Sequence, residues 1–204
     1  MRAIAIIKSE HQNLGAVLYS LEHLLQEIEA GKQPDFGVFH GLLTYIDRFL
    51  DRYHHPKESR YLFPRLLARA PACAGLIHEL EEQHRDGETL FIDMLKALSA
   101  YQFLGESELD HFRSTVLIYT DFERNHARLE EREVLPLAVD RLRAEDWIEI
   151  NAAFVENEDP MFTRERDNEF TGLFSRLVNQ LPAPLGLSEV WKQVADDPDR
   201  AGSD

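Results

Sequence analysis

Apolar residues recur at intervals of three and four along most of the chain, which is the spacing of one buried face of an α-helix. The first such stripe runs from Ile4 to Ile28 and ends at the helix breakers Gly31 and Pro34. Three more stripes follow, over residues 39–62, 77–98 and 109–134. Pro56 lies inside the second stripe and predicts a kink there, because proline removes a backbone hydrogen-bond donor.

Four long amphipathic segments joined by short turns predict an all-α fold, an antiparallel up-down-up-down four-helix bundle over residues 1–142. Beyond the bundle the pattern weakens to a short helix near residues 144–155 and another from Phe162 to Leu181. We interpret residues 143–204 as additional C-terminal helices and an acidic tail, which either cap the bundle or form a homodimer surface.

Each apolar stripe is interrupted by one inward-facing histidine. These four residues are His11, His54, His84 and His126. A single histidine on an apolar face is usually a hydrogen-bonded core residue, but one on every helix indicates a shared site. The other five histidines fall outside the stripes and are predicted at the surface or the rim: His23, His40, His55, His78 and His111.

Two of the inward histidines are followed four residues later by an inward carboxylate, giving the pairs His54–Glu58 and His126–Glu130. This spacing places both members on one helix face. A carboxylate buried in a bundle core costs several kcal/mol unless it is paired, and the stripes contain no inward Lys or Arg. A bound metal would compensate. The alternatives are a His–Glu hydrogen bond with ordered water, or rotated helices that expose the carboxylates.

The two His–Glu segments also read as an internal repeat. Residues 54–64 and 126–136 carry His, Glu, Arg, an aliphatic residue and Pro at identical offsets. His11 and His84 are separated by almost the same interval, so the second half of the bundle looks like a copy of the first. Two such halves would hold two metal ions. The repeated Arg60 and Arg132 are either partners of the carboxylates or solvated surface residues.

The composition and the net charge exclude several classes of protein. A hydrophobic fraction of 44% excludes a disordered chain, and 37 acidic against 22 basic residues give a charge of −15 that disfavours nucleic acid. No apolar run approaches the roughly 18 residues of a membrane span, so we expect a cytoplasmic protein without a membrane partner. Cys73 is the one cysteine. Nitrogen and carboxylate ligands without thiolate favour iron, manganese or zinc.

The block His54-His55-Pro56-Lys57-Glu58, with the later His126-to-Glu130 pair and single histidines at positions 11 and 84, resembles the hemerythrin-like, or HHE cation-binding, family. The resemblance covers about residues 1–142. It implies an up-down four-helix bundle with two iron ions, bridged by an oxo or hydroxo group. It also implies that the four inward histidines are terminal ligands, while Glu58 and Glu130 bridge the irons.

The chain departs from the oxygen-carrying hemerythrins, whose third helix supplies two histidines four residues apart. Here the residues at that spacing from His84 are Leu80 and Glu88, so one iron lacks a histidine. Glu88, Glu123, water or another ligand would take that position, and a position left open suits O2, NO or peroxide. The chain is similar in this respect to the iron- and oxygen-sensing hemerythrin-like domain of a ubiquitin ligase subunit.

Three further residues lie on the stripes within two turns of a histidine. Gly87 either leaves room for a small ligand beside His84 or allows close helix packing. Tyr119 either donates toward the site, or acts as a redox relay, or is an ordinary core residue. Glu123 lies one turn before His126 and is either an extra ligand or an acceptor that orients the imidazole.

The first hypothesis for function is a protein that binds or senses O2, NO or iron at a di-iron site, with no catalytic residue. The alternative is a di-iron enzyme acting on peroxide or ferrous iron, or an iron donor for iron–sulfur cluster repair. Cluster-repair relatives carry a cysteine-bearing N-terminal segment, for which a stripe beginning at Ile4 leaves no room. Dedicated oxidases use Glu-x-x-His where this chain has His-x-x-x-Glu. A third hypothesis is a metal-free interaction module.

Overall fold

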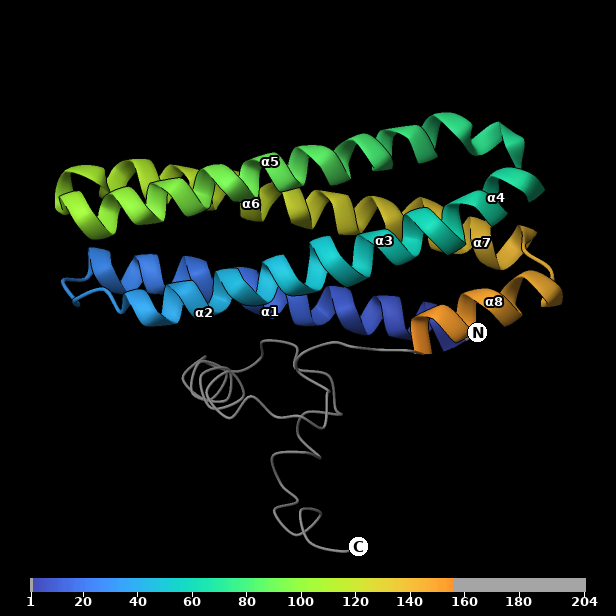
Figure 1. Ribbon diagram of the computed structural model, residues 1–204, viewed down its shortest axis with the longest axis horizontal. Helices are drawn as coiled ribbons and strands as arrows, with labels where there is room; N and C mark the ends of the chain where they lie inside the picture. The colour runs from blue at the N-terminus through green and yellow to red at the C-terminus, as the bar shows by residue number, and fades with distance from the viewer. Residues whose placement is uncertain (1, 156–204) are drawn as a thin grey trace, which may run out of the picture.

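The computed structural model describes residues 2–155, which form four long helical rods that run alternately up and down (Figure 1). The first rod is α1 (Arg2–Glu29) and the third is α5 (Ala74–Leu104), which follows the turn η3 (Pro71–Cys73). The second comprises α2 (Phe36–Ile46), η1 (Asp47–His54), α3 (His55–Lys57), η2 (Glu58–Leu62) and α4 (Phe63–Arg69). The fourth comprises η4 (Glu106–Glu108), α6 (Leu109–Leu129), η5 (Glu130–Val134) and α7 (Leu135–Arg141). The predicted all-α bundle is confirmed, and no helix within these residues is long and apolar enough to span a membrane.

Prolines in the second and fourth rods coincide with three π-helical turns. The turns are η1, η2 and η5, and the pairs that follow them are His55-Pro56, Phe63-Pro64 and Leu135-Pro136. In each case the N–H before the proline donates to the carbonyl five residues back, as from His55 to Leu50. A proline ring crowds the carbonyl four residues back, and a wider turn makes room for it. The irregularity predicted at Pro56 therefore takes the form of a wide turn within a continuous rod.

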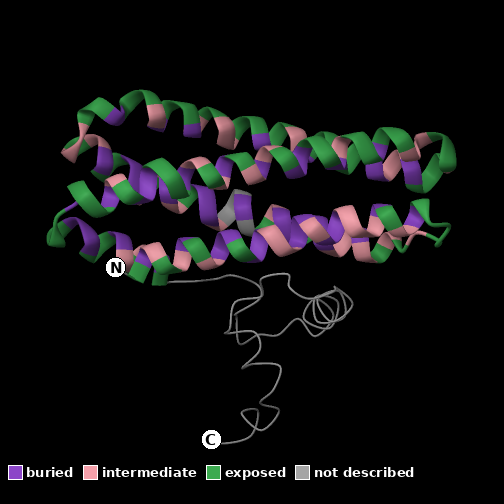
Figure 2. Ribbon diagram, turned by 180° about the vertical axis from the view of Figure 1, so that it is seen from behind, coloured by how far each residue is buried: buried purple, intermediate pink, exposed green. Residues whose placement is uncertain are grey.

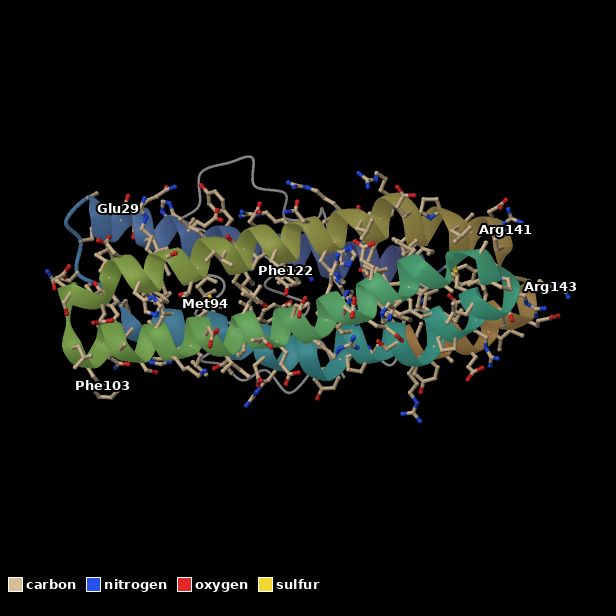
Figure 3. All side chains as sticks on the ribbon, turned by 90° about the horizontal axis from the view of Figure 1, so that it is seen from above. Glu29, Met94, Phe103, Phe122, Arg141 and Arg143 are labelled. Atoms are coloured by element: carbon tan, nitrogen blue, oxygen red, sulfur yellow. The ribbon has the colours of Figure 1, made fainter. Side chains whose placement is uncertain are left out.

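The apolar core is divided into two halves along the bundle. The buried residues lie mainly on the sides of the rods that face one another (Figure 2). The first half includes Leu21, Phe39, Met94 and Phe112 and lies toward the α5–α6 connection. The second half lies at the opposite end, where Arg141 and Arg143 mark the exterior in Figure 3. The residues between the halves are polar, and they form the candidate site.

Helix α8 (Ala144–Val155) packs beside the N-terminal part of α1 (Figure 1). Its apolar face contributes Trp147, Ile150 and Phe154 to the second core half, and its Asn151 Oδ1 accepts a hydrogen bond from the Ala3 N–H at 2.9 Å. The helix predicted near residues 144–155 is thus present and packs on the bundle. The helix predicted from residue 162 to 181 and the acidic tail lie outside the described residues.

Asp146 fastens the start of α8 to the second rod. Its carboxylate accepts from Arg69 Nε at 2.8 Å and from Arg69 Nη2 at 3.0 Å. It also accepts from the Arg143 N–H at 2.9 Å, which satisfies a backbone donor at the helix start. The hydrogen bonds from Arg69 hold the pKa of Asp146 below its usual value. The ionised form is therefore the one that stabilises the fold.

We expect Asp146→Asn to lower the melting temperature at neutral pH by roughly 2–4 °C, the shift that about 1 kcal/mol produces in a chain of this size. Because the folded-state pKa is depressed, the stabilisation is present above the unfolded pKa, about 3.9, and is lost as the pH falls through the folded value. The difference from wild type should therefore shrink under acid. Asp140→Asn is the control, since Asp140 is exposed and pairs with its neighbour Arg141. Equal melting of Asp146→Asn and wild type at neutral pH would contradict this role.

Candidate metal centre

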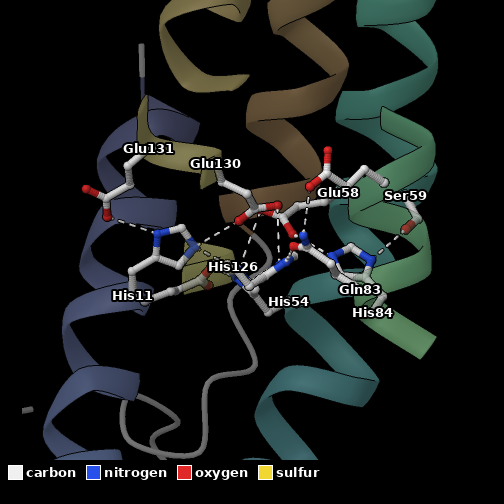
Figure 4. A network of polar contacts seen from close by, with 11 residues as sticks. His11, His54, Glu58, Ser59, Gln83, His84, His126, Glu130 and Glu131 are labelled. Atoms are coloured by element: carbon white, nitrogen blue, oxygen red, sulfur yellow. Dashed lines mark hydrogen bonds and ion pairs between the residues drawn. The ribbon is translucent and has the colours of Figure 1, made fainter. Parts of the chain in front are cut away.

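All six residues predicted as metal ligands lie together in the polar layer between the two core halves (Figure 4). They are His11 on α1, His54 at the end of η1, Glu58 at the start of η2, His84 on α5, His126 on α6 and Glu130 at the start of η5. Each of the four rods thus contributes at least one. The layer is almost sealed from solvent, with Glu58 0% and Glu130 1% exposed.

The six residues form two overlapping groups of four. One group contains His11 and His54 and the other contains His84 and His126, while Glu58 and Glu130 belong to both. Within each group the candidate ligand atoms lie within 4.8 Å of one another. Two adjacent sets of two nitrogens and two carboxylates, sharing both carboxylates, match the donor geometry of a pair of metal ions bridged by glutamates.

The four histidines are oriented by hydrogen bonds at Nδ1. The pairs are His11 with Glu131 at 3.0 Å, His54 with Glu10 at 2.9 Å, His84 with Ser59 at 3.3 Å, and His126 with Gln83 at 2.9 Å. An Nδ1–H that donates to an oxygen leaves the Nε2 lone pair available for a metal, as is usual for metal-binding histidines. The Nε2 atoms of His11 and His54 converge to 3.2 Å. Those of His84 and His126 have no hydrogen-bond partner among residues 2–155.

These four orienting residues were missed by the sequence analysis, yet each is adjacent in sequence to a predicted ligand. Glu10 directly precedes His11 and Gln83 directly precedes His84. Ser59 directly follows Glu58, and Glu131 directly follows Glu130. Each of them serves a histidine on the next rod, so the hydrogen bonds form a closed ring around the bundle. Adjacent helical residues point about 100° apart. When one side chain points toward the bundle axis, the next residue therefore points toward a flanking rod. The residues adjacent to the predicted ligands could have been identified from the sequence in this way.

Burial and neighbouring charges determine the pKa values of the two central glutamates. Burial, with the charges of Glu130 and Glu10, raises the pKa of Glu58 well above its usual value. For Glu130 burial acts in the same direction, but contacts with His126 and His11 outweigh it and lower the pKa to about 2. Neither oxygen of Glu58 accepts a hydrogen bond from residues 2–155. Orphaned carboxylate oxygens in a sealed layer are costly, and a cation between them would offset that cost.

The imidazoles provide the complementary partners. Burial and the neighbouring His126 lower the pKa of His84 to about 3, and burial also lowers the pKa of His126. Both are therefore neutral near pH 7, which is the form that binds metals. For His11, burial is outweighed by contacts with Glu130 and Glu131, which raise its pKa to about 9. The residues present fit a cation, since a metal can replace that proton.

The other predicted residues take different places. Glu123 is buried at 1% exposure on α6 before His126, whereas Glu88 is exposed on the rim of an opening beside His84. Tyr119 is buried in the first core half. Arg60 and Arg132 are exposed, and Arg132 donates to Glu133 at 3.0 Å. Of the two interpretations of these arginines, the solvated surface is the one that the structure supports.

The expectation that His55 lies at the surface or the rim is wrong. His55 is 6% exposed, its ring stacks on that of His84 with centroids 4.0 Å apart, and its ring also meets His126 edge-on at 5.2 Å. The prediction failed because it allowed one buried stripe for each helix. The second rod packs against two neighbouring rods and therefore buries residues outside that stripe. Of the other four, His23 and His40 are half-buried, and His78 and His111 are exposed.

Three openings between rods have a candidate ligand in their lining. One, of about 200 Å³, lies between α1 and α6 and is lined by His11 and Glu123 among others. Another, of about 230 Å³, includes His84. The third, of about 600 Å³, lies between α5 and α6 and includes His126. The first two volumes are below the roughly 300–1,000 Å³ of typical sites for organic ligands, so those two openings suit small inorganic molecules.

Comparison with known proteins identifies the family. The model of the hemerythrin HHE cation binding domain matches residues 2–138, so the chain belongs to this family. Three curated proteins, each described as uncharacterized, are 24% identical over 153 residues; one is from Mycobacterium bovis and two are from strains of Mycobacterium tuberculosis. The matches cover 75% of this chain, which spans about 60% of the length of these relatives. No solved structure matches.

Gly87 on α5 faces α6 at close range. A Cβ placed there would lie 2.8 Å from Oε1 of Glu123 and 3.3 Å from the Phe122 ring, so close helix packing accounts for this glycine. We expect Gly87→Ala to stabilise the protein less than Gly15→Ala does, because the Glu123 carboxylate and the Phe122 ring must shift to admit the methyl group, which offsets the gain in helix propensity. Gly15→Ala is the matched control, because nothing lies within 4 Å of its Cβ position. It should stabilise the protein by up to about 1 kcal/mol through helix propensity. Denaturant titration measures both, and equal effects would contradict the packing argument.

Proposed function

We propose that this chain is a non-haem di-iron protein that binds or senses O2, NO or iron itself. One observation carries the proposal: two groups of two histidines each share the same pair of buried glutamates, Glu58 and Glu130. A single metal would not require two such groups. A hydrogen-bonded core without metal would not leave both oxygens of Glu58 without a hydrogen bond from the described residues.

Iron is favoured by the donor set. Each group offers two imidazole nitrogens and two carboxylates, and no thiolate takes part, because Cys73 lies in the second core half. Dinuclear carboxylate centres in helical bundles are most often iron, although manganese and zinc accept the same donors. Bound iron would supply redox-active ions with coordination positions open to a small ligand.

The ligand that we propose is small and inorganic. The opening beside His11 has a volume of about 200 Å³, and its lining includes Gly15 and Ala127, which occupy little space. A diatomic molecule fits an opening of this size, which is below that of typical sites for organic ligands. The chain's own residues hold the metals, orient the imidazoles from Nδ1 and exclude bulk water from the layer.

Anaerobic purification followed by elemental analysis tests the metal content. We expect about two iron ions per chain, and charge-transfer absorption that grows on exposure to air or changes on addition of NO. The control is a variant in which His54 and His126, one from each group, are replaced by alanine. Iron at the level of the control even after ferrous loading would contradict the proposal. Rapid turnover of peroxide or ferrous iron would instead favour the enzyme interpretation.

Glu58→Gln should have opposite effects with and without metal. In the metal-free protein we expect an unchanged or higher melting temperature, because burial already drives Glu58 toward its neutral form and the amide is neutral at every pH. With metal in excess the wild type should gain about 4 kcal/mol at a concentration 1,000 times its dissociation constant, and the variant should lose most of that gain. Glu106→Gln is the control, since Glu106 is exposed in η4, at the connection between α5 and α6. The same metal-dependent shift in Glu58→Gln and wild type would contradict a ligand role.

A further inference from the structure

We propose that the opening between α5 and α6 binds an aromatic mononucleotide, that is, a flat ring system joined through a sugar or sugar alcohol to a phosphate. This opening, called the α5–α6 groove below, has a volume of about 600 Å³ and is lined by residues of α5, α6 and η5. The volume lies within the roughly 300–1,000 Å³ that is typical of sites for organic ligands. The proposal goes beyond the proposed function, because it concerns an organic molecule held outside the polar layer.

One end of the α5–α6 groove is apolar. Ile118 is 53% exposed, and Phe122 is half-buried where α5 and α6 run side by side (Figure 3). The two residues are four positions apart on α6, so their side chains share one helix face. Ligand sites are lined mainly by apolar and aromatic side chains, with a few polar groups that fix the orientation. This end therefore suits the face of a flat aromatic ring.

The other end of the groove is cationic. Arg128 and Arg132 are both exposed and are also four positions apart, on the side of the fourth rod that lines the groove. Arg128 Nη1 donates to Asn125 Oδ1 at 3.1 Å, and Arg132 Nε donates to Glu133 at 3.0 Å. The remaining N–H groups of the two guanidiniums suit a phosphate, which such groups bind in pairs. In a chain of net charge −15, two adjacent arginines provide a local site for an anion.

Two carboxylates also line the groove, and each is held by an amide of its own helix. Glu79 accepts from Gln83 Nε2 at 3.3 Å, and Asp121 accepts through Oδ2 from Asn125 Nδ2 at 3.2 Å. Neither carboxylate pairs with an arginine of the groove, so the guanidiniums are not neutralised across it. Oδ1 of Asp121, beside Phe122, is left to accept from an N–H group of a heteroaromatic ring.

The distance between the two ends determines the length of the ligand. Ile118 precedes Arg128 by ten residues, and Phe122 precedes Arg132 by the same number. Ten residues of helix extend about 15 Å. A simple aromatic acid is too short to contact both ends. A ring system separated from its phosphate by a sugar or sugar alcohol has the required length.

The groove meets the candidate metal centre at one residue. His126 lines the groove, and its Nδ1 donates to Gln83 Oε1 at 2.9 Å. Its Nε2 lies on the side of the polar layer, 3.6 Å from Glu130 Oε1. A molecule in the groove would therefore contact the outer edge of this imidazole without competing for its Nε2. Binding is expected to require no metal, so it can be measured in the metal-free protein.

The test titrates flavin mononucleotide into the metal-free full chain and follows the flavin fluorescence. We expect saturable binding of one molecule per chain, and riboflavin, which lacks the phosphate, should bind at least tenfold more weakly. The double variant Arg128→Gln/Arg132→Gln should lose at least tenfold in affinity for flavin mononucleotide and keep the wild-type affinity for riboflavin. Arg113→Gln/Arg141→Gln is the matched control, because it also removes two exposed charges from the fourth rod but neither residue lines the groove.

A second pair of variants tests the apolar end. Ile118→Asn should weaken the binding of both flavins, whereas Leu117→Asn should not, because Leu117 is 44% exposed on α6 but does not line the groove. The absence of saturable binding of both flavin mononucleotide and adenosine monophosphate would overturn the inference. Equal affinity of the wild type and Arg128→Gln/Arg132→Gln for flavin mononucleotide would also overturn it. Either result would leave the di-iron proposal intact, since no metal is present in the titration.

Discussion

The structure depends on two glutamates, Glu58 and Glu130, held side by side where a bundle of this kind would otherwise be apolar. Their burial is complete, and like charges at short range are unfavourable in a medium of low polarity. The apolar core is interrupted at that level and resumes on either side. Hydrophobic stabilisation therefore comes from two separate halves, and the cost of the polar layer between them is lowered by protonation of Glu58 and by cationic partners. Protonated His11 is one such partner, and metal ions are stronger ones.

The ring of hydrogen bonds around the bundle explains how four rods hold such a layer in register. Glu10, Ser59, Gln83 and Glu131 each lie next to a candidate ligand on their own rod and bind an imidazole on the next. A shift of one rod along its axis by one helical turn would break two of these hydrogen bonds, because each rod contributes one orienting residue and one histidine to the ring. The ring thus couples helix register to imidazole orientation. The two core halves then determine where the layer lies along the bundle axis.

The helices and the six central residues could be predicted from the sequence because both follow the 3.6-residue period. The period places His54 and Glu58 on one face, and the repetition of that pair at His126 and Glu130 shows that it is no accident of composition. The same reasoning failed at His55, because a helix with neighbours on two sides buries more than one stripe. It also could not see the π turns, which depend on where each proline forces a carbonyl outward.

The π turns bear on the site because they occur where the candidate ligands are. His54 ends η1, Glu58 begins η2 and Glu130 begins η5. A wide turn shifts the following residues around the helix axis, and such turns are frequent at functional sites. The two sequence halves of the bundle share an arrangement in which a His–Glu pair lies at a wide turn. At the residue that follows each histidine the two halves differ, since His55 is buried in the polar layer and Ala127 lines an opening. A bundle built from two similar halves can in this way surround one polar layer with different side chains on its two sides.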